Sequence, residues 1–147
     1  MIDAAYSLSD DPAALQIDVI HGYLARSYWS PAVDRDLVAR AIAGSHCVGI
    51  YHRGTQVAFA RVVTDYATFA HLADVFVLEE HQGAGLASAM LGYFHDHPRL
   101  QGLRRWTLNT RDAHSLYERH GWTRITDGDP APFMQRYDAD ASRRAAS

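Results

Sequence analysis

Lysine is absent from this chain of 147 residues, in which every basic side chain other than histidine is arginine. Without a lysine amine, the protein cannot form a lysine Schiff base or use a lysine nucleophile. A Walker phosphate-binding loop is excluded as well, because its pattern G-x-x-x-x-G-K-[ST] requires a lysine. One missing residue type therefore removes two large classes of site.

Cysteine is almost absent, since Cys47 is the single one. One cysteine cannot form an internal disulfide, and such low use is typical of a reducing compartment. We expect Cys47 to pack within a strand rather than to act as a nucleophile. No apolar run approaches the length of a membrane span, and the first residues lack the basic region and apolar core of a signal peptide. We therefore expect a cytoplasmic protein with no membrane partner.

An excess of positive charge is lacking too, since the formal net charge is −3 and the pI is about 6.3. Nucleic-acid-binding proteins usually carry a basic face, so we expect no nucleic-acid partner. The apolar share of 48% is ordinary for a folded protein, and the length suits one domain. We expect that domain to span residues 1–137 and the polar, alanine-rich residues 138–147 to form a disordered tail.

Apolar periodicity predicts an α/β fold with a mixed sheet. Helical spacing runs from Asp10 or Asp11 to about Ala25, and a second helix is predicted from Asp34 to Ala43. The predicted strands are residues 4–8, 46–51, 56–63, 72–78, 103–108, 122–125 and 133–137, and later helices begin near 85 and at 113. This order indicates one central mixed sheet flanked by helices on both faces.

A glycine-rich turn, Gln82-Gly83-Ala84-Gly85-Leu86-Ala87, joins the strand at 72–78 to the helix that follows. Small residues leave the backbone amides open to a ligand. The first N–H groups of a helix lack acceptors and lie at the positive end of its dipole, so the turn is a candidate phosphate cradle. A dinucleotide fold requires a third glycine where this chain has Ser88. A plain strand-to-helix turn remains an alternative for this stretch alone.

Two separate blocks resemble the GNAT N-acetyltransferase superfamily. Gln82, Gly85 and Ala87 fill its Q/R-x-x-G-x-G/A signature. One helix and one strand later, the chain is similar to the block N-x-x-A-x-x-L-Y-x-x-x-G-F. The matching residues of that block are Ala113, Leu116, Tyr117 and Gly121, followed by the aromatic Trp122. The usual asparagine is replaced by Thr110, with Asn109 one residue early. Threonine can cap the following helix, but a side-chain contact from this position to a cofactor is in doubt.

The resemblance implies acetyl-CoA as co-substrate and Tyr117 as the general acid that protonates the departing thiolate. It also implies that the strand ending at Val77 pairs with the pantetheine arm, while the turn holds the pyrophosphate. An amide at or beside Val77 would polarise the thioester carbonyl. The implied cofactor-binding residues are Val75, Phe76, Val77, Gln82, Gly83, Ala84, Gly85, Leu86, Ala87, Thr110 and Tyr117. Tyr117 on an apolar helix face could instead be a core residue.

Several residues are candidates for the general base. Strand alternation would place Asp74 on one side together with Leu72, Phe76 and Leu78. An acid within an apolar run needs a partner, so Asp74 could bind the acceptor ammonium, relay its proton or be a hydrogen-bonded structural residue. Glu79 is a weaker candidate, because it and its neighbour Glu80 suit solvated turn charges. His71 is a further candidate, because its ordinary pKa suits proton transfer near neutrality.

The acceptor pocket is expected to involve two aromatic residues. Tyr28 and Trp29 lie where the superfamily's variable loop between its first two helices covers the acceptor, although core packing is the alternative. We expect no metal site, because His95-Asp96-His97 lacks a third ligand at a recognisable spacing.

The resemblance therefore predicts an acetyl-CoA-dependent N-acetyltransferase that acts directly on the amine of a small molecule. A non-catalytic acyl-CoA-binding or sensor module is an alternative. An RNA-directed acetylating toxin is another, which the acidic balance disfavours. Small enzymes of this superfamily often pair, so a homodimer is possible. The acceptor itself is beyond the sequence.

Overall fold

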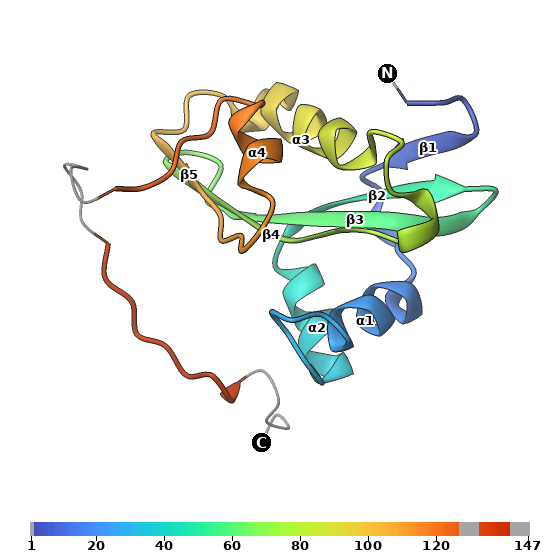
Figure 1. The fold of residues 1–147 in the computed structure, drawn as a ribbon, viewed down its shortest axis with the longest axis horizontal. Coiled ribbons are helices and arrows are strands. Elements are labelled where there is room, and N and C mark those ends of the chain that lie inside the picture. Colours follow the sequence, from blue (N-terminus) through green and yellow to red (C-terminus); the bar gives the residue numbers. More distant parts are fainter. Residues whose placement is uncertain (1, 127–132, 142–147) are drawn as a thin grey trace.

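Five strands form one mixed sheet in the computed structural model, which describes residues 2–126 and 133–141 (Figure 1). The strands lie in the order β1-β2-β3-β4-β5. The first four are antiparallel to their neighbours, whereas β4 and β5 run parallel. Their bounds are β1 Tyr6–Ser9, β2 His46–His52, β3 Thr55–Thr64, β4 Phe69–Val77 and β5 Arg105–Thr107.

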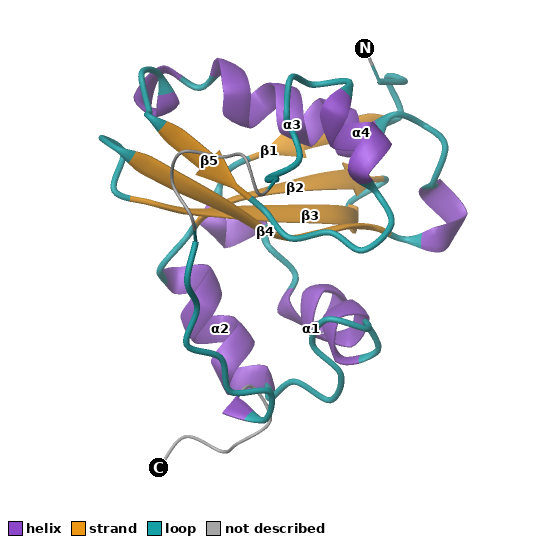
Figure 2. Ribbon diagram, turned by 60° about the vertical axis from the view of Figure 1, so that its left-hand side comes forward, coloured by secondary structure: helices purple, strands orange, loops and turns teal. Residues whose placement is uncertain are grey.

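Helices cover both faces of this sheet. Figures 1 and 2 show α1 and α2 on one face, and α3 and α4 on the other. Their bounds are α1 Ile17–Ala25, α2 Arg35–Ala43, α3 Leu86–Asp96 and α4 His114–Glu118, with short 3-10 helices η1 Pro12–Ala14, η2 Glu79–His81 and η3 Pro98–Leu100. The predicted α/β class, a central mixed sheet flanked by helices on both faces, is confirmed.

Two hydrophobic clusters hold these layers together, one on each face of the sheet. The cluster under α3 and α4 contains Val48, Ile50, Val62, Leu72, Leu86, Met90, Leu91, Phe94 and Tyr117. The cluster under α1 and α2 contains Ile20, Leu24, Val33, Val38, Cys47, Phe59 and Phe76. Burial raises the pKa of the Cys47 thiol to about 11. The expected packing of Cys47 within a strand is therefore confirmed, and the thiol stays protonated near neutral pH.

The first predicted helix, from Asp10 or Asp11 to Ala25, is in fact divided. Gln16 separates η1 from α1, because its backbone N–H donates to Gln56 Oε1 at 2.8 Å and its own Oε1 accepts from the Gln56 N–H at 3.0 Å. Its side-chain amide also donates to the carbonyl of Gly54 at 2.9 Å. This junction ties the start of α1 to the β2–β3 hairpin. The second helix matches its prediction, with Asp34 capping α2 through the N–H of Leu37 at 3.1 Å.

The two strands predicted after α4 are wrong. Residues 122–125 and 133–137 adopt no strand, although their β-propensity favoured one. A strand forms only beside a partner, and much of this region is open to water: Ile125 is 57% exposed and Met134 is 98% exposed. Of the predicted tail, residues 138–141 are described as exposed turn and helical-turn structure. Residues 142–147 lie outside the described part of the chain.

Among the described residues, no helix is both long enough and apolar enough to cross a membrane.

Candidate functional site

The sheet divides at its parallel edge, where β5 is much shorter than β4. Pairing between them covers only Phe69–His71 and Arg105–Thr107, so β4 continues to Val77 without a neighbour on that side. A cleft of about 1190 Å³ lies there. Its walls come from β4, the start of α3, the β5–α4 connection, α4 and the loop between α1 and α2.

A β-bulge shapes the part of β4 that borders the cleft. Phe59 pairs with Phe76 but Arg61 pairs with Ala73, so β4 contains one extra residue between these pairs. Asp74 sits in the bulge with φ 55°, a left-handed conformation that aspartate tolerates better than most residues.

The bulge overturns the predicted alternation of β4. Leu72 packs in the cluster under α3 and α4, whereas Phe76 packs in the cluster under α1 and α2. The prediction that Leu72, Asp74, Phe76 and Leu78 share one side is therefore wrong, because the extra residue reverses the faces of the residues that follow it.

The glycine-rich turn forms an open set of amides at the mouth of the cleft. Gly83 and Gly85 have φ of 83° and 78°, and Gly85 is the N-cap of α3. Among the described residues, the N–H groups of residues 83 to 88 find no hydrogen-bond acceptor, and the first helical bond runs from the N–H of Ala89 to Gly85. These amides can therefore receive an anion.

Gln82 departs from the predicted cradle, because its groups are already engaged. Its N–H donates to the carbonyl of Glu79 at 3.3 Å. Its side-chain amide donates to the carbonyl of Val77 at 3.1 Å. Gln82 thus braces the turn against the end of β4 rather than offering its amide. Ala84 is the one predicted cofactor-binding residue that does not line the cleft; those that do are Val75, Phe76, Val77, Gln82, Gly83, Gly85, Leu86, Ala87, Thr110 and Tyr117.

Tyr117 projects from α4 and is 8% exposed. It both packs in the core and lines the cleft, so the two alternatives weighed from sequence are not exclusive. Burial, and secondarily the nearby Tyr28, raises the pKa of the Tyr117 hydroxyl. The phenol is therefore protonated near neutral pH. Within the described ranges its oxygen has no hydrogen-bond partner, so its proton is available to a ligand.

Thr110 does not cap α4, whose N-cap is Ala113 without a side-chain hydrogen bond, but it braces the turn before the helix. Its Oγ1 accepts the N–H of Ala113 at 3.0 Å in the turn that leads into α4. Its hydroxyl is thereby engaged in holding the helix that carries Tyr117. Asn109 and Thr110 both line the cleft.

Both predicted acidic bases are held by arginines. Asp74 accepts from Arg61 at 2.7 Å and from the indole N–H of Trp29 at 3.0 Å, so both of its oxygens are used. Arg26 binds Glu79 at 2.5 Å and lowers the pKa of that carboxyl to about 2. The lowered pKa makes Glu79 a weak base, and Asp74 has no oxygen left without a partner. The geometry therefore favours neither residue as a base, although both line the cleft; Glu80 does not.

His71 lines the cleft at the point where the pairing of β4 with β5 ends. Its side chain is half-buried, and its Nδ1 lies 2.8 Å from Oγ1 of Thr107, the residue paired with it on β5. Burial lowers the pKa of His71 and Arg61 lowers it further, while Asp74 opposes the shift. The imidazole is therefore neutral near pH 7, and Nε2 has no partner among the described residues.

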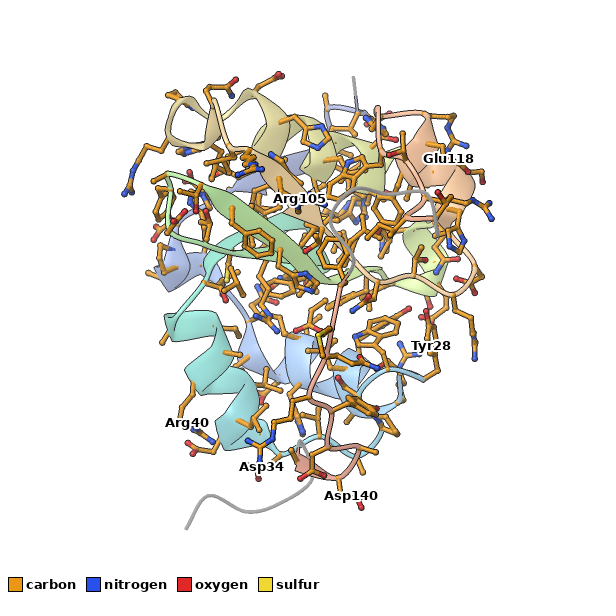
Figure 3. The ribbon with its side chains drawn as sticks, turned by 90° about the vertical axis from the view of Figure 1, so that its left-hand side faces the viewer. Tyr28, Asp34, Arg40, Arg105, Glu118 and Asp140 are labelled. Atoms are coloured by element: carbon orange, nitrogen blue, oxygen red, sulfur yellow. The ribbon has the colours of Figure 1, made fainter. Side chains whose placement is uncertain are left out.

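Aromatic residues form the wall of the cleft on the side of α1. Tyr28 is 46% exposed and Trp29 is 38% exposed, and both line the cleft. Tyr23 stacks on Phe76 with ring centroids 4.2 Å apart. The backbone N–H of Arg111 donates to the Tyr28 hydroxyl at 3.2 Å, so the loop after α1 touches the β5–α4 connection across the cleft. In Figure 3, Tyr28 lies on the same side of the molecule as Glu118 of α4.

Sequence reasoning missed three contributors to this wall: Tyr23, Arg26 and Arg111. Tyr23 falls within the first predicted helix, where its apolar spacing gives no sign of a cleft. The partners of Arg26 and Arg111 lie 53 and 83 residues away in the chain, so no local pattern could have found them.

The two histidines at the end of α3, His95 and His97, lie in different surroundings. The ring of His95 faces Trp106 and Trp122, whereas His97 lies close to Asp10 and His46. The possible ligand atoms of these last three residues all lie within 4.8 Å of one another.

Three of the four ring nitrogens in the group of Asp10, His46 and His97 have hydrogen-bond partners. The two ring nitrogens of His46 lie 2.9 Å and 2.6 Å from the hydroxyls of Tyr66 and Tyr93. Nδ1 of His97 accepts the N–H of Arg99 at 3.1 Å. A metal would have to displace these hydrogen bonds.

The chain is similar to known proteins in sequence and in fold. The family model described as "Acetyltransferase (GNAT) domain" matches residues 43–124. A protein of Gibberella zeae named as a "putative acetyltransferase" is 35% identical over 135 residues, covering 76% of this chain and 75% of that protein. Residues 43–124, which the family model matches, contain β4, β5, the glycine-rich turn and Tyr117.

Solved structures agree with this match. A protein of Xanthomonas campestris pv. campestris, described as a "putative acetyltransferase belonging to the gnat family", is 46% identical with a TM-score of 0.87, covering 93% of this chain and 96% of that one. A similarly described protein of Deinococcus radiodurans R1 is 18% identical with a TM-score of 0.74 over the whole of both chains. The second likeness shows the fold alone.

We predict that Asp74→Asn destabilises the protein by about 2 kcal/mol, because it leaves Arg61 without its counter-ion in a largely buried place. Asparagine tolerates the left-handed backbone at this position, so the loss reflects the charge. Urea unfolding measures the change. Glu118→Gln, which breaks an exposed pair with Arg124, is the control and should stay within about 0.5 kcal/mol. Equal losses in both variants would contradict the assigned role of Asp74.

Proposed function

Because the chain belongs to the GNAT family of acetyltransferases, we propose that it transfers an acetyl group from acetyl-CoA directly to the amine of a small molecule. Bound acetyl-CoA would supply an activated acyl group as a thioester. The protein must then bind a polyanionic arm, polarise a carbonyl, accept a proton from the amine and return one to the leaving sulfur.

The observation that carries this proposal is the set of free amides at residues 83 to 88, beside the unpaired edge of β4. Backbone N–H groups and a helix dipole bind a pyrophosphate without any basic side chain. This explains how a chain with a formal net charge of −3 can hold a polyanion. The edge of β4 that β5 leaves unpaired, which includes the N–H of Val77, would offer backbone groups to an extended amide-containing arm, much as a further strand would.

Tyr117 is the general acid in this proposal. Its hydroxyl is protonated near neutral pH, free of other partners and directed to the same cleft as the amides. A thiolate leaving group needs one proton, and a buried phenol can deliver it. A module that only binds acyl-CoA would have no use for this arrangement.

His71 is the general base in this proposal. In this proposal the Nδ1–H of His71 donates to the Thr107 hydroxyl, which leaves the lone pair of Nε2 free to accept a proton. Asp74 and Glu79 are poorer candidates, because Arg61 and Arg26 hold them.

We also propose a cytoplasmic location. The support is the single cysteine, buried as a protonated thiol within a strand.

Gly85→Glu should abolish CoA binding, measured by isothermal titration calorimetry, with affinity reduced by at least about 100-fold. A carboxylate at the helix start would meet the pyrophosphate. Gly102→Glu is the matched control, because Gly102 has a similar φ of 75° and lies away from the cleft. It carries the same strain and charge but should bind CoA normally. Retained affinity in Gly85→Glu would remove the cradle assignment.

Tyr117→Phe should lower kcat by about 100-fold while CoA affinity changes little, since only the proton of the general acid is removed. Release of free thiol, followed across a panel of amines, measures the rate. Tyr137→Phe, at an exposed position outside the cleft, is the control. If the wild-type protein and the variant both bind CoA and neither releases thiol with any amine, the protein is a binding module.

His71→Gln should remove the acidic limb of the pH profile of kcat/KM. The base works unprotonated, so wild-type activity falls as the pH drops through the pKa of His71. Burial and Arg61 lower that pKa, and the limb therefore lies below about pH 6.5. His114→Gln, which does not touch the cleft, should keep the wild-type profile. An unchanged limb in His71→Gln would assign the base elsewhere.

A further inference from the structure

Most of the negative charge on the acceptor side of the cleft is compensated. Of the three carboxylates that line the cleft, Asp74 and Glu79 are paired with Arg61 and Arg26. Beside them the cleft has an aromatic wall. It is made by Tyr23, Tyr28, Trp29 and Phe76.

Arg111 adds an uncommitted cation to this wall. Its guanidinium lies 3.8 Å from the centroid of the Tyr28 ring. Within the described residues, no carboxylate pairs with it, in contrast to Arg26 and Arg61. The neighbouring Asp112 also lines the cleft without an ion pair.

Tyr28 fixes the position of this guanidinium. The Tyr28 hydroxyl accepts the backbone N–H of Arg111, while its ring packs against the side chain of the same residue. Stacking on an aromatic ring covers the face of a guanidinium and leaves the N–H groups at its edge free. A guanidinium held in this way is ready to bind a carboxylate through two parallel hydrogen bonds.

A second unpaired arginine, Arg119, lies elsewhere in the cleft. His120 Nε2 is 3.0 Å from Ser88 Oγ, so the end of α4 lies beside the first turn of α3 and the free amides. Arg119 therefore belongs to the side that would hold the phosphates. Arg111 belongs to the side of the aromatic residues.

We propose that the acceptor is an amine that also carries a carboxylate and an apolar or aromatic group, and that Arg111, stacked on Tyr28, binds this carboxylate. The inference rests on the proposed function and narrows its substrate class. An amino acid with an aromatic side chain has all three features: the amine to be acetylated, a carboxylate for Arg111 and a ring for the wall.

The test compares acceptors that differ only in the carboxylate: phenylalanine with phenethylamine, and tryptophan with tryptamine. Thiol release gives kcat/KM for each. Wild-type protein should favour the acid of each pair by about ten- to a hundred-fold, the range for a hydrogen-bonded charged pair. Arg111→Gln should remove this preference without changing CoA affinity, and Arg111→Lys should keep only part of it. Arg104→Gln, an exposed site outside the cleft, should match the wild type.

Three outcomes overturn the inference. Equal kcat/KM values for both members of each pair in the wild type would show that the protein does not recognise the carboxylate. An unchanged preference for the acids in Arg111→Gln would show that another residue binds the carboxylate. A large loss of CoA affinity in Arg111→Gln would make Arg111 part of the phosphate site.

Binding measurements separate this inference from the proposed function. If no member of any pair releases thiol, acetyl transfer to these amines is refuted. Calorimetric titration of the two acids into the CoA-bound protein still decides the role of Arg111. Binding of the acids by the wild type and its loss in Arg111→Gln would support that role, whereas no difference between the proteins would refute it.

Discussion

The early end of pairing between β4 and β5 is the constraint on which the rest of the site depends. A sheet edge that loses its neighbour exposes backbone groups that must find water or a ligand. Here the pairing ends at His71 and Thr107. The bulge at Asp74 then reverses the face of the sheet to which the later side chains of β4 point. The glycine-rich turn follows from the end of the same strand. One departure from regular pairing therefore sets the cleft, the open edge and the start of α3 together.

The second organising feature is the way charge is distributed around this cleft. Three carboxylates line it. Asp74 and Glu79 are paired with arginines, whereas among the described residues Asp112 has no ion pair, and neither has Arg111, which lies over an aromatic ring. The proposed proton-transfer groups of the cleft are a half-buried histidine and a buried tyrosine. Their pKa values are displaced in opposite senses, downward for His71 and upward for Tyr117, and burial is the main cause of both. Burial disfavours whichever form carries the charge, so one kind of environment leaves a free base and a protonated acid.

Local features were predictable from sequence, and those that depend on distant partners were not. The glycine-rich turn and the block around Tyr117 are short patterns whose geometry follows from their own residues, as does the hydrogen bond between Thr110 and Ala113 in the turn before α4. The bulge at Asp74 has no such signal, because it is defined by the register of β4 against β3. The division of the first helix depends on Gln56, 40 residues beyond Gln16. The strands predicted after α4 are wrong for a related reason. Their residues have strand propensity, but a strand also needs a neighbouring strand, which propensity does not supply.

The arginines of the cleft have a chemical consequence of their own. Arg26 and Arg61 lie beside the proposed site of acyl transfer, held against Glu79 and Asp74. A lysine in either place could lose its proton and attack a thioester, whereas a guanidinium cannot be deprotonated in a protein. The wall of the cleft thus offers no amine that would compete with the acceptor. In a chain without any lysine, the enzyme we propose is protected from acetylating its own side-chain amines.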